Sequence, residues 1–85
     1  MEFIIVAFRS RAQTIKFANL LNAHGVSMEI VNTPKEAGVG CGLSVKIKSQ
    51  SLELVKRVVF NLSLSSFAGF FMVKEIGGRK IVKSI

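Results

Sequence analysis

The order of strand-like and helix-like segments predicts an α+β fold, a two-layer sandwich of one antiparallel sheet and two helices. An apolar run at residues 3–8 precedes a segment with helical periodicity at 11–24. Two alternating segments then flank a loop at 33–42, and a second helical segment at 51–64 leads into another apolar, strand-like run. At 85 residues the chain is short enough to form one domain, residues 1–85.

The first half of this pattern has clear local signals. Residues 3–8 are apolar and rich in β-branched side chains, which predicts a strand buried on both faces. Ser10 and Gln13 have the spacing of a capping box, so a helix is expected from 11 to 24, with Gly25 as its C-terminal cap. The apolar stripe expected on this helix consists of Ala12, Ile15, Ala18, Leu20 and Leu21.

The middle of the chain returns to a period of two. Residues 27–32 place Met28 and Ile30 on one face, which predicts a second strand. Residues 43–48 alternate in the same way and predict a third strand with one solvated face. The expected apolar face of that strand consists of Leu43, Val45 and Ile47, and the solvated face of Ser44, Lys46 and Lys48.

The last part predicts a helix, a strand and a hairpin. The expected stripe of the helix at 51–64 consists of Leu52, Val55, Val58, Val59 and Leu62. A strand at 69–76, the pair Gly77-Gly78 and a strand at 79–85 together predict a two-residue β-hairpin. The resulting order, βαββαβ with a C-terminal β-hairpin extension, is the split βαβ pattern of ferredoxin-like folds. Two helices cover only one face, so a homodimer built on the open face or on strand edges is expected.

Composition limits the function classes. No apolar run approaches the ~20 residues that span a bilayer, and no signal-peptide pattern is present, so a cytoplasmic protein without membrane contact is expected. One Cys excludes an internal disulfide, and with one His and no Asp we expect neither metal nor cofactor. The net charge of +7 favours anionic partners such as nucleic acid, acidic proteins or a small anionic ligand. The same charge would also serve solubility alone.

The loop at residues 33–42 carries the sharpest chemical signal. It contains the only proline, Pro34, the only cysteine, Cys41, and three of the seven glycines. Proline restricts the accessible backbone conformations and glycine widens them. This composition therefore predicts a shaped loop that presents one thiol at the start of a strand. Gly40 and Gly42 leave room for their backbone N–H groups to approach an anion or a polysulfur group.

Cationic groups are expected around that thiol. Lys35 lies in the same loop, and Arg9 and Arg11 stand where the first strand ends and the first helix begins. Positive charge and a helix N-terminus favour a thiolate, which would make Cys41 a reactive nucleophile. The alternative is a packed, inert thiol, because free cysteine is among the most buried residue types. Nothing in the sequence brings His24 near Cys41 as a general base.

These residues carry a family resemblance. The segments Phe8-Arg9-Ser10, 31–34 (Val-Asn-Thr-Pro) and 40–43 (Gly-Cys-Gly-Leu) resemble a family of small bacterial proteins described as selenium/sulfur carrier-like, over roughly residues 3–60. The resemblance implies that the Cys41 sulfur accepts a transferable sulfur or selenium atom, with Pro34 and Gly42 shaping the site. It further implies donor and acceptor proteins as partners, and a carrier or accessory protein rather than a stand-alone enzyme.

Two other readings remain open. One is a non-catalytic dimeric module for regulation or assembly. The other is a basic nucleic-acid-binding domain, since ferredoxin-like sheets with aromatic residues bind single-stranded RNA. Phe70 and Phe71 would supply the aromatic groups, but the expected Lys/Arg-Gly-aromatic motif is absent, and they fall on the fourth strand rather than the third. The more ordinary expectation is that these phenylalanines belong to the core.

Overall fold

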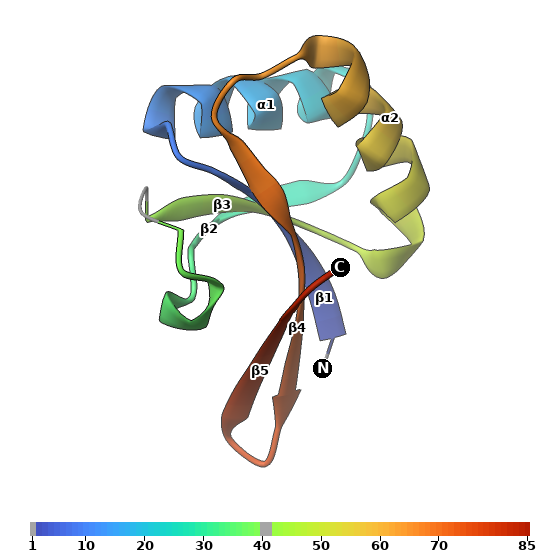
Figure 1. Ribbon diagram of the computed structural model, residues 1–85. Helices are drawn as coiled ribbons and strands as arrows, with labels where there is room; N and C mark the ends of the chain where they lie inside the picture. Colours follow the sequence, from blue (N-terminus) through green and yellow to red (C-terminus); the bar gives the residue numbers. More distant parts are fainter. Residues whose placement is uncertain (1, 40–41) are drawn as a thin grey trace.

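The computed structural model describes residues 2–39 and 42–85, and it has two helices on one face of a five-stranded antiparallel sheet (Figure 1). The combination of helices with an antiparallel sheet is as predicted, and so is the number of helices. The elements are β1 (Glu2–Phe8), α1 (Arg11–Ala23), β2 (Met28–Asn32), the 3-10 turn η1 (Lys35–Ala37), β3 (Leu43–Ile47), the 3-10 turn η2 (Ser49–Ser51), α2 (Leu52–Leu62), β4 (Phe67–Ile76) and β5 (Arg79–Ser84).

The strand order is β2-β3-β1-β4-β5, and every neighbouring pair is antiparallel. β1 is therefore the central strand, which explains its continuous apolar sequence. Ile4 and Val6 face the helices, whereas Ile5 and Ala7 face the opposite side, and all four are at most 1% exposed. The predicted double burial of this strand is confirmed.

An aromatic cluster joins the helix layer to the sheet. The rings of Phe8 and Phe17 have centroids 5.1 Å apart, and Phe67 and Phe70 are separated by the same distance. Tilted and edge-to-face ring contacts of this kind add to the stability gained from burial alone. The buried core around them also contains Ile4, Val6, Ala18, Leu21, Val26, Val45, Ile47, Val55 and Val59.

The buried stripe of α1 differs from the predicted one. The helix buries Thr14, Phe17, Ala18 and Leu21, whereas Ala12 is exposed, Ile15 is 40% exposed and Leu20 is half-buried. Thr14 can be buried because its hydroxyl donates to the Ser10 carbonyl at 3.0 Å. Apolar residues lie around the whole circumference of this helix, so period alone selected the wrong side for its first turns.

The stripe of α2 is confirmed, although the helix is shorter than expected. Val55 and Val59 are buried, and Leu52, Val58 and Leu62 are half-buried. The α-helix begins at Leu52 after the turn η2 and ends at Leu62, since Ser63 adopts a left-handed conformation with φ of 50°. No helix within residues 2–39 and 42–85 is long and apolar enough to cross a membrane.

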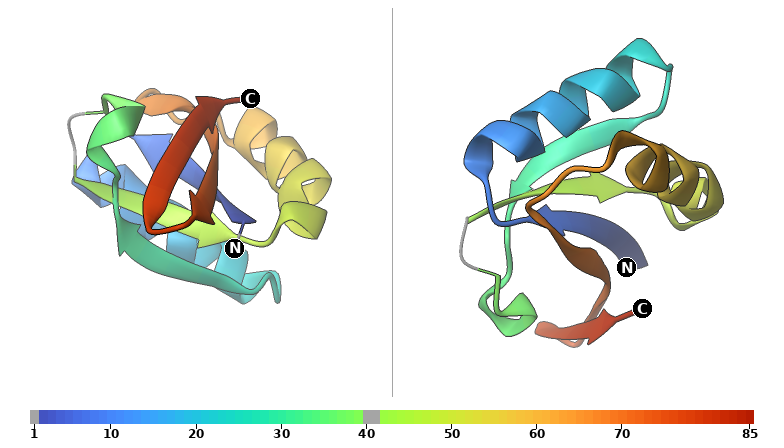
Figure 2. Two further views of the ribbon diagram at one scale, coloured as in Figure 1. Left: turned by 90° about the horizontal axis from the view of Figure 1, so that it is seen from below. Right: turned by 45° about the horizontal axis from the view of Figure 1, so that its top comes forward.

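The face of the sheet opposite the helices is closed at its centre by the chain itself. The turn η1 lies on that side and contacts β5 (Figures 1 and 2). Ile5, Ala7, Ser44 and Val73, which all point to this side, are fully buried. A homodimer was expected because this face of the sheet would otherwise be uncovered. At this part of the sheet the face is covered, so that argument for a homodimer does not apply here. The predicted solvated face of β3 is also wrong at Ser44.

Candidate functional site

The two ends of the 33–42 loop are tied together where β2 ends and β3 begins. The Thr33 N–H donates to the Gly42 carbonyl at 2.9 Å, and the Thr33 and Ser44 hydroxyls share a hydrogen bond of 2.7 Å. Ser44 is fully buried, so this second bond satisfies a polar group inside the fold. Cys41 and Gly40, two of the predicted site residues, lie outside the described residues. Gly42, the residue bonded to Cys41, is held in place.

Backbone geometry accounts for the residue types at two places in this loop. Pro34 has φ of −60°, and its carbonyl accepts the Ala37 N–H at 3.1 Å, which closes the turn η1. Gly42 has φ of +83°, which side chains with a Cβ rarely adopt, and it is exposed with open space around it. These dihedral angles suit a proline and a glycine at the two positions, and the site-shaping roles of Pro34 and Gly42 stay predictions.

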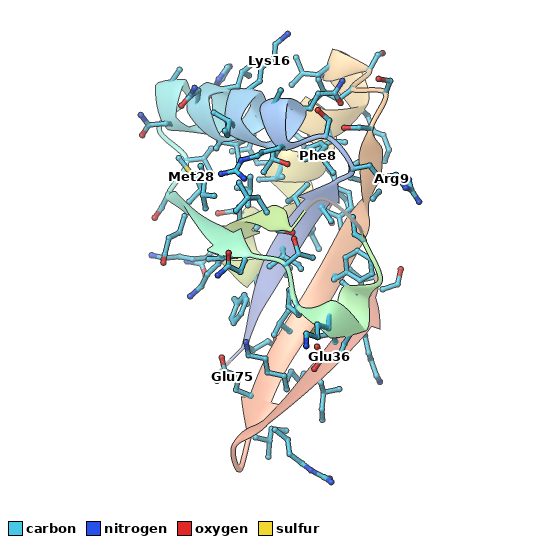
Figure 3. The ribbon with its side chains drawn as sticks, turned by 90° about the vertical axis from the view of Figure 1, so that its left-hand side faces the viewer. Phe8, Arg9, Lys16, Met28, Glu36 and Glu75 are labelled. Atoms are coloured by element: carbon cyan, nitrogen blue, oxygen red, sulfur yellow. The ribbon has the colours of Figure 1, made fainter. Side chains whose placement is uncertain are left out.

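Arg9 lies at the same end of the sheet as the start of β3. Antiparallel pairing of Ala7 with Ser44 places the C-terminal end of β1 beside the first residues of β3, where Gly42 precedes. The predicted proximity of the first strand's end to the loop is therefore found. Arg9 is exposed and lies beside the start of β4 in Figure 3.

The start of α1 is fixed by a link that the sequence did not predict. Ser10 accepts the Gln13 N–H at 3.2 Å, which is one half of the expected capping box. The Gln13 side chain does not return to Ser10. Its Oε1 accepts the Ser66 N–H at 3.0 Å, and its Nε2 donates to the Ser65 hydroxyl at 3.2 Å. The Ser66 carbonyl in turn accepts the Arg9 N–H at 2.7 Å, so residues 9–13 are anchored to the segment before β4.

The predicted cations approach the loop from two sides. Arg11 opens α1, whose first turn carries no acidic side chain, so the positive end of the helix dipole is not neutralised there. Lys35 lies on η1, on the side of the sheet away from the helices, and is followed by the exposed Glu36 (Figure 3). Arg11 thus lies at the start of a helix on one side of the sheet, whereas Lys35 lies on the other side, so these two predicted cations do not form one cluster.

His24, the only histidine, lies far from the start of α1. His24 is exposed, and its Nδ1 donates to the Leu20 carbonyl at 2.8 Å. It stands at the opposite end of α1 from Ser10, about 20 Å away at 1.5 Å per residue. Among residues 2–39 and 42–85, no three His, Asp or Glu side chains come together as metal ligands.

The aromatic residues considered for RNA binding do not form a platform. Phe70 is 5% exposed and packs edge-on against Phe67 within the core. Phe71 is half-buried and points to the opposite face, as its pairing with Ile5 requires. Stacking platforms for single-stranded nucleic acid need accessible ring faces. The expectation that these residues belong to the packed interior fits Phe70 best.

A comparison with known protein families found one match. The model of the family described as "Putative Se/S carrier protein-like" matches residues 3–65. This span covers β1 to α2 with the whole 33–42 loop, and it stops before β4. No curated protein and no solved structure matches the chain.

Proposed function

Because the chain belongs to the selenium/sulfur carrier-like family, we propose that it carries a sulfur or selenium atom on the side chain of Cys41. The family match over the loop and its flanking strands is the observation that carries this proposal. The remaining site residues have supporting roles. Pro34, Gly40 and Gly42 shape the loop, whereas Arg9, Arg11 and Lys35 supply positive charge.

The proposed loading step is a thiol–persulfide exchange. The Cys41 thiolate attacks the terminal sulfur of a donor persulfide, R–S–S–H. The donor S–S bond breaks, a new S–S bond forms on Cys41, and the donor leaves as a thiolate while the proton stays on the transferred sulfur. No electrons are gained or lost overall. The sequence contains no second cysteine to attack this persulfide, which keeps the sulfur available for an acceptor.

The anchored surroundings support this chemistry. The Thr33–Gly42 hydrogen bond holds the residue next to Cys41, and the unneutralised start of α1 lies at the same end of the sheet. Cations and a helix N-terminus favour the thiolate, the form that reacts. Since the described residues place no imidazole there, the donor and acceptor proteins would supply any proton transfer. The proposed role is that of a carrier or accessory protein rather than a stand-alone enzyme.

We also infer that the fold is the ferredoxin-like split βαβ arrangement, with β5 as an added edge strand. β3 lies between β1 and β2, and β1 lies between β3 and β4, which is the interleaving that this arrangement requires. The dimeric module and the nucleic-acid-binding domain remain alternatives without a specific observation in their favour.

Sulfur loading tests the carrier function directly. Reduced protein is incubated with inorganic polysulfide, and its intact mass is measured before and after treatment with cyanide. We expect the wild-type chain to gain sulfur that cyanide releases as thiocyanate, and Cys41→Ser to gain none. A wild-type thiol that iodoacetamide alkylates but that acquires no cyanide-labile sulfur would overturn the proposal.

A further inference from the structure

One face of the β4–β5 hairpin carries large apolar side chains that no helix covers. Ile4, which faces the helices, pairs with Met72, so alternate residues of β4 from Met72 onward point to the helix side. Their partners on β5 share this face. On it, Ile76 is 60% exposed, Ile81 is 44% exposed and Ile85, which follows β5, is 48% exposed.

These side chains line one continuous hollow. Its volume is about 400 Å³, and its lining consists of Met72, Lys74, Ile76, Ile81, Lys83 and Ile85. We call this surface the hairpin face. Isolated exposed apolar residues are common on protein surfaces, but a contiguous group around a hollow marks an interaction site. We therefore expect a binding partner to cover the hairpin face.

The opposite face of the hairpin is already used inside the protein. Val73 is fully buried, Val82 beside it is half-buried, and β5 contacts η1. Gly77 and Gly78, with φ of 56° and 79°, form the tight turn that joins the two strands. The hairpin is thus held from one side, and its other face is presented outward.

The charges of the hairpin face select the kind of occupant. Lys74, Arg79 and Lys83 share it with the apolar residues, and the one ion pair formed there among the described residues joins Lys74 to Glu2 at 3.4 Å. An acidic partner is electrostatically complementary to this face. A second copy of this chain would bring lysines against lysines, which is unfavourable in an isologous contact.

The same arrangement disfavours a membrane. Cations and isoleucines alternate across the strands, with Lys74 opposite Ile81 and Arg79 opposite Ile76. Elements that lie on membranes instead separate an apolar face from a charged one. Burying these isoleucines in lipid would carry their charged neighbours with them.

We propose that the hairpin face binds an amphipathic helix of an acidic partner protein, as a third helix in the layer of α1 and α2. A strand of six residues is about 20 Å long, which equals a helix of about 14 residues. A helix about 10 Å across also covers two strands about 4.8 Å apart. The face lies in residues 72–85, beyond the family match, so the proposal does not depend on Cys41.

The experiment uses the full chain and a defined probe. The probe is a fluorescein-labelled helical peptide of about 14 residues, with leucines spaced three and four apart and glutamates on both flanks. Fluorescence anisotropy measures its binding. We expect Ile81→Ser and Lys83→Glu each to weaken binding about tenfold, because each removes a contact from the centre of the face. A matched peptide with lysine in place of every glutamate should bind at least about tenfold more weakly.

Matched variants distinguish peptide binding at the hairpin face from nonspecific binding elsewhere on the protein. Leu54→Ser removes a side chain that is 48% exposed on α2, and Lys16→Glu reverses an exposed charge on α1. We expect both to change peptide affinity less than about twofold. Equal losses in these controls, equal binding of the lysine peptide, or no binding to the folded chain would overturn the proposal. Dimerisation that Ile81→Ser abolishes, or Ile81-dependent binding to phosphatidylglycerol vesicles without peptide binding, would likewise overturn it.

Discussion

The Gln13 carboxamide oxygen accepts the Ser66 backbone N–H at 3.0 Å, across 53 positions of sequence. This bond ties the first turn of α1 to the segment that enters β4, next to the end of β1. A side chain that the sequence assigned to a local cap therefore connects the two halves of the fold.

Removing that connection should lower stability. Gln13→Ala leaves the partly buried Ser66 N–H without its acceptor, so we expect the free energy of unfolding to fall by about 1–2 kcal/mol. Urea denaturation measures the change. Asn19→Ala, at an exposed position of the same helix, is the control and should change stability by less than about 0.5 kcal/mol. Equal effects of the two variants would contradict the structural role of Gln13.

The hydroxyl pair at the base of the loop gives a second prediction. Thr33→Val keeps the side-chain shape but removes the partner of the fully buried Ser44 hydroxyl. We expect a loss of about 1–2 kcal/mol in the free energy of unfolding, because a buried polar group then lacks a hydrogen bond. Thr33→Ser should retain most of the stability. In a double-mutant cycle, Ser44→Ala should make Thr33→Val much less costly, and strictly additive losses would count against the pairing.

The cations at the start of α1 give a prediction about reactivity. Arg9→Gln and Arg11→Gln each remove positive charge from the end of the sheet that carries Gly42. We expect the pH midpoint of Cys41 alkylation by iodoacetamide to move to higher pH in both, since the thiolate loses electrostatic support. Lys16→Gln, farther along α1, is the matched control with the same change of charge. An unchanged midpoint in both arginine variants would remove these residues from the proposed site.

The buried side of α1 can be tested by two truncations. Phe17→Ala removes a fully buried ring, and we expect it to cost about 3–5 kcal/mol. Ile15→Ala truncates a side chain that is 40% exposed and should cost less than about 1 kcal/mol. Thermal and urea unfolding measure both. The reverse order of effects would favour the stripe expected from sequence periodicity over the observed one.

Strong local signals were sufficient for several elements. The unbroken apolar run of β1 requires cover on both faces, the stripe of α2 follows a clean helical period, and Gly77-Gly78 suits a two-residue turn. In α1, by contrast, apolar residues on several sides leave the period ambiguous, and the burial of Thr14 depends on a hydrogen bond that composition does not reveal.

Long-range contacts set the limit of prediction for the site. The hydrogen bond from Ser66 to Gln13 joins residues distant in sequence, and so does the contact of η1 with β5 on the sheet face opposite the helices. No local sequence pattern predicts either contact. The sequence did indicate that the end of β1 would lie near the loop, because the strand order follows from the expected fold. The sequence also grouped Lys35 with Arg11 around the loop, whereas η1 carries Lys35 on the side of the sheet away from α1.

The hydrogen bond between Thr33 and Gly42 has a consequence for how partner proteins would approach the chain. It holds the end of β2 against the start of β3, so the proposed carrier residue is attached to an anchored end of the sheet. Under the proposed function, donor and acceptor would both dock at this end. Their contact surfaces would therefore overlap, and the two proteins would bind in turn rather than together.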